Sequence, residues 1–127
     1  MRLERGINDI VGAGVKAALI LLLSFLAACS SGPRTDLPAI RGMRSAAAEW
    51  ALVNREAARG RLTPAYTAGM RKAMREEIAK QARTLAPESP EAAAVAALQA
   101  LPPSAAPGLI MRQAAALKRI EAALESA

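Results

Sequence analysis

The sequence contains no histidine and only one cysteine, Cys29. Histidine is the commonest metal ligand and the side chain best suited to proton transfer near neutral pH, so its absence removes a large class of catalytic and metal sites. A catalytic triad built on a serine and a histidine is excluded outright. A single thiol also cannot form an intramolecular disulfide, so no covalent cross-link stabilises the fold.

Aromatic residues make up 2% of the chain and are limited to Phe25, Trp50 and Tyr66. Alanine dominates after Pro33, and an alanine-rich chain forms helix readily but buries little area per residue. We therefore expect marginal stability and a dependence on a partner or on self-association. Nothing else is large enough to fill the gap between two helices, so Trp50 and Tyr66 are both expected in the core rather than in an exposed binding spot.

No group of acidic residues has the arrangement of an active site. Glu76 and Glu77 are adjacent, and adjacent side chains on a helix point about 100° apart, so the two carboxylates cannot converge on one substrate atom. Glu121 and Glu125 share a helix face and are expected to be solvent-exposed charges. No glycine-rich phosphate loop follows the apolar run described below. We predict a protein that is not an enzyme, with no catalytic residue, no metal site and no cofactor.

The chain also lacks an apolar run long enough to cross a membrane. Residues 17–28 form a run of 12 residues in which only Ser24 is polar, whereas a membrane-spanning helix needs about 20. Positively charged residues precede the run, and its length fits the hydrophobic region of a secretory signal, which is roughly 7–15 residues. The run ends in the small residues Ala27 and Ala28, whose size suits the groove of a signal peptidase.

The residues Leu26-Ala27-Ala28-Cys29 resemble the lipobox of bacterial lipoproteins, at which the signal peptide is cleaved and the chain is lipidated. The resemblance implies that residues 1–28 are a signal peptide and that the sulfur of Cys29 receives a diacylglycerol. Acylation of the new amino group, for example with palmitate, would follow cleavage. Two or more acyl chains hold a protein firmly on a membrane, so Cys29 would attach this chain to lipid without a spanning helix. An uncleaved signal anchor is the alternative.

The residues around the lipobox bear on the final location. Ser30 stands where similar lipoproteins that stay in the inner membrane have Asp, which implies the periplasmic face of the outer membrane. Residues 29–38 are rich in small, polar, glycine and proline residues, which disfavour regular structure, so we predict a flexible tether. Translation from Val15 instead of Met1 would give a more compact signal peptide and is an alternative start.

The rest of the chain has the apolar spacing of a small all-helical domain, predicted to cover residues 39–127. Apolar residues recur three and four apart from 39 to 59 and predict a first helix there. Gly42 weakens its first turn, so the firm part of the helix is expected from Met43. Gly60 is placed to cap its C-terminus.

A second helix is predicted after a clear turn. Thr63 is expected to cap it, and Pro64 suits its first position. The helix is expected to run to about Leu85, and the short connection makes an antiparallel hairpin over residues 39–86. Its apolar stripe comprises Tyr66, Met70, Met74, Ile78, Ala82 and Leu85.

Two further helices are predicted at residues 90–101 and 105–125. Ser89 and Ser104 are expected to cap them, and Pro102-Pro103 separates them. The last helix has a seam close to heptad spacing, made of Ile110, Ala114, Leu117, Ile120 and Leu124. The predicted fold class is therefore all-α, with no strand.

The predicted hairpin carries most of the positive charge. Residues 55–83 contain eight arginines and lysines and three glutamates, a net charge of +5 in a chain whose total is +6. Such a surface favours an anionic partner: lipopolysaccharide phosphates, acidic lipid headgroups or peptidoglycan carboxylates. The candidate contacts are Arg55, Arg59, Arg61, Arg71, Lys72 and Arg75. The alternative is an ordinary solvated face on which Glu76 pairs with Lys80.

These patterns predict a non-enzymatic envelope lipoprotein with a structural or interaction role. Nucleic acid is not expected as a partner, because an exported protein rarely meets it and no aromatic residues are interleaved with the charges. The alternative is an accessory subunit that docks its alanine-rich helices onto a larger envelope protein complex. A monomer that stays folded alone favours the first role, whereas a molten or aggregating one favours docking.

Overall fold

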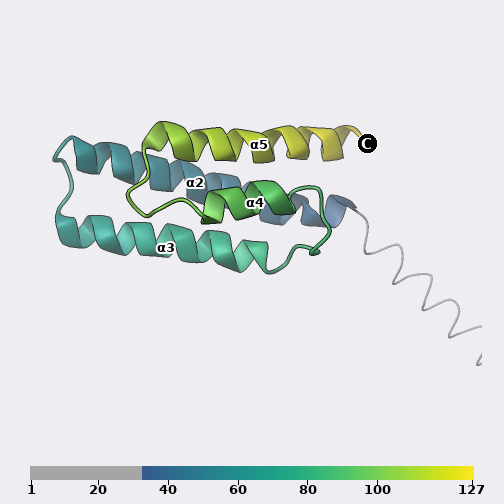
Figure 1. Ribbon diagram of the computed structural model, residues 1–127, viewed down its shortest axis with the longest axis horizontal. Coiled ribbons are helices and arrows are strands. Elements are labelled where there is room, and N and C mark those ends of the chain that lie inside the picture. The colour runs from purple at the N-terminus through teal and green to yellow at the C-terminus, as the bar shows by residue number, and fades with distance from the viewer. Residues whose placement is uncertain (1–32) are drawn as a thin grey trace, which may run out of the picture. The chain divides into compact units, whose positions relative to one another are not determined.

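The computed structural model describes residues 33–127. A short 3-10 helix, η1 (Pro33–Asp36), leads into four α-helices (Figure 1): α2 (Leu37–Ala58), α3 (Pro64–Ala82), α4 (Ala92–Gln99) and α5 (Pro107–Ser126). The described residues include no strand, which confirms the predicted all-α fold class for this part of the chain. Cys29, the predicted signal peptide and the first part of the predicted tether, residues 29–32, lie outside the described residues. The prediction of a tether without regular structure is wrong for residues 33–38, which belong to η1 and to the first turn of α2.

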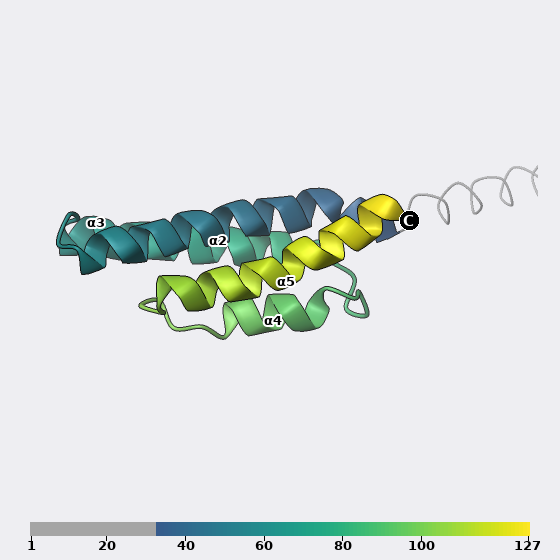
Figure 2. The same ribbon diagram turned by 90° about the horizontal axis from the view of Figure 1, so that it is seen from above.

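The helix α2 is central to the unit formed by Asp36–Ala127. It packs against α3 on one side and against α5 on the other, while α4 lies next to α5 and α3 (Figures 1 and 2). The helices α2 and α3 form the expected antiparallel hairpin. The helix α5 also runs antiparallel to α2, since Asn54 near the end of α2 bonds the residues before α5, and Arg41 near its start reaches Glu125. No helix in residues 33–127 is long and apolar enough to cross a membrane.

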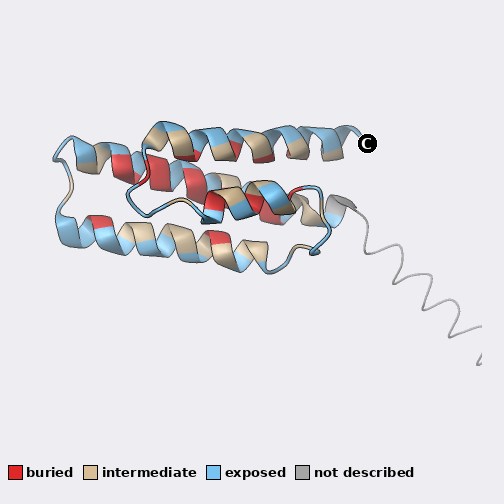
Figure 3. Ribbon diagram, in the orientation of Figure 1, coloured by how far each residue is buried: buried red, intermediate tan, exposed pale blue. Residues whose placement is uncertain are grey.

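The core is made mainly by one face of α2. Its centre is Trp50, which is 1% exposed, and the other fully buried large apolar side chains are Ile40, Met43, Ile78, Leu98, Ile110 and Leu117. Alanines on the same face keep the helices close together. The helix α3 contributes only Ile78 to the fully buried apolar set, and Figure 3 shows little buried surface along it. Within the hairpin, α2 therefore contributes far more buried apolar side chains than α3 does.

The prediction that Tyr66 lies in the core is wrong. Tyr66 is 53% exposed. It lies in the first turn of α3, and the described residues place only α2 beside that turn, because α4 and α5 do not extend to this end of the hairpin (Figures 1 and 2). A helix face needs a second neighbour to bury a ring of this size, and here there is none.

The helix α2 begins earlier than predicted, although Gly42 was expected to weaken its first turn. It starts at Leu37 rather than 39, and Gly42 lies well inside it. The missing side chain leaves room for α3, because a Cβ built on Gly42 would lie 3.2 Å from the side chain of Gln81. The close packing explains why a residue of low helix propensity is tolerated there.

The turn between α2 and α3 follows the predicted chemistry. Gly60 has a φ of 72°, the left-handed conformation that suits glycine. Its N–H donates to the Ala57 carbonyl at 3.0 Å, and the N–H of Arg61 donates to the Glu56 carbonyl at 3.0 Å. The Thr63 hydroxyl then accepts from the N–H of Tyr66 at 3.2 Å. Both predicted caps of this turn are confirmed.

The remaining helix ends differ from those predicted. The helix α3 stops at Ala82 rather than near Leu85, because the Thr84 hydroxyl donates to the Gln81 carbonyl at 2.7 Å and the chain tightens into a turn. Ser89 and Ser104 cap no helix: α4 begins at Ala92 and α5 at Pro107. Both helices start later than predicted. The N–H of Ala92 donates to the Ser89 carbonyl at 3.1 Å, which forms a turn before α4, and Pro107 occupies the first position of α5.

Candidate anion-binding groove on α3

The six candidate cations separate into two groups. Arg55, Arg59 and Arg61 lie around the α2–α3 turn, and all three contact the carboxylate of Glu56. The Arg59 and Arg61 guanidinium groups lie 3.3 and 3.1 Å from its oxygens, and that of Arg55 lies 3.8 Å away. Their charge is partly neutralised and their side chains are exposed, which is the pattern of an ordinary solvated surface.

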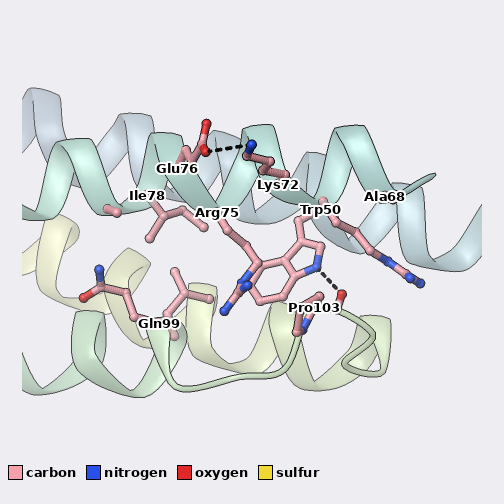
Figure 4. A pocket seen from close by; sticks show the side chains of 11 residues that line it. Trp50, Ala68, Lys72, Arg75, Glu76, Ile78, Gln99 and Pro103 are labelled. Carbon is pink, nitrogen blue, oxygen red and sulfur yellow. Dashed lines mark hydrogen bonds and ion pairs between the residues drawn. The ribbon is translucent and has the colours of Figure 1, made fainter. Parts of the chain in front are cut away.

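The second group lies along a groove beside α3. Arg71, Lys72 and Arg75 line a cavity of about 570 Å³ that α3 forms with α4 and the loop after it (Figure 4). Apolar groups from Trp50, Ile78, Ala79, Leu98 and Pro103 line the same cavity. The surface inside the groove is mainly apolar. We call this cavity the α3 groove.

Arg75 is held over an aromatic ring. Its guanidinium carbon lies 5.9 Å from the centroid of the Trp50 ring, within the range of a cation–π contact (Figure 4). The Arg75 side chain is half-buried. No carboxylate of the described residues lies within ion-pair distance of it.

Arg71 is held by a buried amide. Its Nε donates to Oδ1 of Asn54 at 2.7 Å, and Asn54 is buried. The Asn54 Nδ2 in turn donates to the carbonyls of Pro103 at 3.0 Å and Ala105 at 2.8 Å. Because the amide nitrogen must face two carbonyls, its oxygen must face Arg71. Only Nε of Arg71 is engaged, so its two terminal nitrogens keep their donors for another partner.

The loop after α4 is fixed to α2 through the Pro103 carbonyl. The Nε1 of Trp50 donates to the Pro103 carbonyl at 2.8 Å, so this oxygen accepts from both Trp50 and Asn54 (Figure 4). Neither Asn54 nor Pro103 was predicted from the sequence as a site residue. The signal for Asn54 was its place four residues after Trp50, a polar side chain on the buried face of α2, which needs hydrogen-bond partners.

The electrostatics of the groove favour an anion. A half-buried cation is stabilised best by a charged hydrogen-bond partner, yet within residues 33–127 Arg71 and Arg75 have only neutral partners. Lys72 lies 3.9 Å from Glu76, and both of these side chains are exposed. The prediction that Glu76 pairs with Lys80 is therefore wrong, because Glu76 contacts the lysine on the preceding turn instead. Three cations and one acid line the groove, which makes it positive.

Glu121, expected to be solvent-exposed, is instead buried, with 7% of its surface accessible. Its carboxylate accepts from Nε of Arg41 at 3.1 Å and also pairs with Arg44, while Arg41 reaches Glu125 as well. Burial alone raises the pKa of Glu121, but the hydrogen bonds from Arg44 and Arg41 outweigh it and hold that pKa below its usual value. The same contacts, led by the hydrogen bond to Glu125, raise the pKa of Arg41. These residues join α2 to α5 and form no reactive site.

A second buried carboxyl lies at the start of α4. Glu91 is 0% exposed, and neither of its oxygens has a hydrogen-bond donor; the Ser89 hydroxyl is also without a partner. Burial, followed by the neighbouring Asp36, raises the pKa of Glu91 to about 6, because the two carboxyls can share a hydrogen bond only while one is protonated. No group of three or more potential metal-ligating side chains occurs within residues 33–127.

The raised pKa of Glu91 predicts a pH dependence of stability. A proton held more tightly in the folded state stabilises the fold below the unfolded pKa of 4.5, and this stabilisation is lost as the pH rises through about 6. Glu91→Gln should therefore stabilise the domain by on the order of 1 kcal/mol at pH 7.5 and have little effect at pH 4.5. Urea unfolding at both pH values measures this. Glu88→Gln, on an exposed neighbour, is the control, and equal effects of the two substitutions would contradict the prediction.

No model of a known protein family matches this sequence, and no curated protein or solved structure matches it either. The function must therefore be inferred from the residues of the chain itself. Two features carry it: the lipobox resemblance that ends at Cys29, and the α3 groove with its two arginines that lack an acidic partner.

Proposed function

We propose that this chain is a non-enzymatic, membrane-anchored envelope lipoprotein that contacts an anionic envelope component through the α3 groove. The observation that supports the contact is that Arg71 and Arg75 are half-buried and held by Asn54 and Trp50, with no carboxylate partner among the described residues. The lipobox resemblance at residues 26–29 supports the anchor.

The groove suits an oxyanion for a geometric reason. The two arginines are four residues apart on α3 and therefore share a face. The Arg71 side chain is oriented by Asn54 before any ligand arrives, which reduces the entropy lost on binding. A guanidinium offers paired N–H donors that match the oxygens of a phosphate or a carboxylate. Lipopolysaccharide, acidic lipids and peptidoglycan all present such groups.

Reversing the charge of both arginines should weaken the contact. The mature acylated protein, inserted in neutral phosphatidylcholine vesicles, is expected to capture labelled phosphatidylglycerol vesicles. Arg71→Glu with Arg75→Glu should lower the apparent affinity at least about thirtyfold, since each cation near an anionic surface contributes about 1 kcal/mol. Co-flotation of the label measures the capture.

The matched control changes the net charge equally on another helix. Arg112→Glu with Arg119→Glu alters two exposed side chains of α5 that have no hydrogen bond or ion pair within residues 33–127. If this control loses as much capture as the groove variant, general surface charge rather than the α3 groove binds the anion. Capture that is unchanged in the groove variant would refute the proposed contact.

The anchor predicts a clear result in cells. Wild-type protein should take up labelled palmitate and fractionate with the outer membrane, whereas Cys29→Ser should carry no label and keep residues 1–28. Ser30→Asp is the matched control: it should keep the label but move to the inner membrane. Absence of label on the wild-type chain would refute lipidation.

The alternative role as an accessory subunit has one supporting observation. Leu52 on α2 and Met111 on α5 are each 46% exposed, and Met111 lines a second groove with Ala48 and Ala115 between these helices. A protein partner would cover this apolar surface. Sedimentation of the purified mature chain separates the two roles: a folded monomer favours the first, and aggregation favours docking.

A further inference from the structure

The α3 groove has two chemically different parts. Arg71, Lys72 and Arg75 supply positive charge along α3. The opposite side, which includes Pro103 above the fully buried Leu98, is apolar apart from the amide of Gln99 (Figure 4). A simple oxyanion would satisfy only the first part. At about 570 Å³ the cavity is also far larger than one phosphate needs and lies within the usual size of a small-molecule site.

We infer that the α3 groove binds one anionic phospholipid from the membrane to which the protein is attached, with the phosphate between Arg71 and Arg75 and part of an acyl chain along the apolar side. This inference rests on the proposed function, because it identifies the anion as a lipid phosphate and adds the apolar contact. Peptidoglycan carboxylates would meet the charge but leave the apolar side empty.

The tether supports a membrane source for the ligand. Seven residues, 30–36, lie between Cys29 and Leu37, the first residue of α2, and the last four of them form η1. A chain of this length spans at most about 29 Å. Acylated at Cys29, the domain would therefore stay close to the lipid surface, and a high local lipid concentration would compensate for weak affinity.

Ligand entry requires a movement of Arg75. Its guanidinium covers the Trp50 ring, and Trp50 is almost completely buried. A phosphate bound by Arg75 and Arg71 would draw the guanidinium off the ring, so that the acyl chain replaces it there. Trp50 is the only tryptophan of the chain, so its fluorescence reports this exchange directly.

The test is a fluorescence titration of the mature acylated protein in neutral phosphatidylcholine nanodiscs. Dihexanoyl phosphatidic acid should give a saturable change in Trp50 emission, while dihexanoyl phosphatidylcholine, which enters the disc with the same chains, should give none. Dibutyryl phosphatidic acid should bind more weakly, by up to about fourfold for each buried methylene that is lost. Inorganic phosphate at the same concentrations should give no change.

Variants locate the site. Arg71→Gln with Arg75→Gln should raise the half-saturation concentration at least about tenfold, because each charged hydrogen bond contributes about 1.5–3 kcal/mol. The same changes at Arg112 and Arg119 should leave the titration unaltered. Retained binding in the groove variant overturns the inference.

Two outcomes separate this inference from the proposed function. If affinity does not depend on chain length and inorganic phosphate competes equally, the groove binds phosphate alone; the lipid inference then fails while vesicle capture stands. If vesicle capture is also independent of Arg71 and Arg75, the proposed function fails as well.

Discussion

Replacing Trp50 by alanine is expected to lower the free energy of unfolding by about 3–5 kcal/mol. Trp50 is the largest fully buried side chain, and it lies at the centre of the core on α2. Five of the twelve other residues in the core cluster are alanines, whose short side chains cannot fill the space that an indole leaves. Small domains are stable by only about 5–15 kcal/mol, so the variant should be close to unfolded at 37 °C. Urea unfolding followed by far-ultraviolet circular dichroism measures the loss.

Trp50→Phe separates packing from the hydrogen bond. The smaller ring keeps most of the apolar contact but loses the bond from Nε1 to the Pro103 carbonyl, so the expected loss is about 1–2 kcal/mol. The Pro103 carbonyl still accepts from Asn54, which limits the cost. If Trp50→Ala and Trp50→Phe unfold at the same urea concentration, the indole does not fill the core in the way that its burial indicates.

The sequence predicts the hairpin well where short-range chemistry decides the conformation. At the α2–α3 turn, Gly60 adopts the left-handed conformation, and Thr63 caps α3 within three residues of its own position. These bonds require no distant partner, so a local pattern is sufficient. At Ser89 and Ser104 the same reasoning fails, because Glu91 and Ala106 occupy the N-cap positions of α4 and α5 and neither makes a side-chain capping bond.

The candidate site was predictable only in part. Arg71 and Arg75 could be identified as cations on one helix face, but not as a pair without acidic partners. Their orientation depends on Asn54 and Trp50, which are themselves fixed by the Pro103 carbonyl, 49 and 53 residues away along the chain. These hydrogen bonds join residues far apart in the sequence and depend on the packing of the loop after α4 against α2. The local spacing of residues therefore could not predict them.

The seam of α5 shows a case in which spacing and residue type disagreed. Strict heptad spacing after Ile110, Ala114 and Leu117 falls on the charged Glu121. The predicted seam instead contained its apolar neighbour Ile120. The structure buries Glu121 because the antiparallel register of α2 and α5 brings two arginines to it. Ile120 is partly buried against the core, as its place in the predicted seam requires, and only the expectation that the charged Glu121 would be exposed is wrong.

Glu121→Ala is expected to destabilise the domain by about 2–3 kcal/mol. Removing one member of a buried ion pair costs about 3–5 kcal/mol, because the remaining charge loses its partner. The cost here should be lower, because Arg41 and Arg44 keep 55% and 31% of their side-chain surface accessible to water. Glu125→Ala is the matched control: its carboxylate is exposed and also contacts Arg41, so its loss should be below about 1 kcal/mol.

The lowered pKa of Glu121 adds a pH test with a defined sign. A carboxyl whose pKa falls on folding stabilises the fold above its unfolded pKa of 4.5, and this stabilisation disappears as the pH falls through the folded value. Wild-type protein should therefore lose stability on acidification below about pH 4.5, and Glu121→Gln should lose less. Urea midpoints at pH 7 and pH 3 measure the difference. A Glu121→Ala variant no less stable than Glu125→Ala at pH 7 would show that the buried contact does not hold α2 and α5 together.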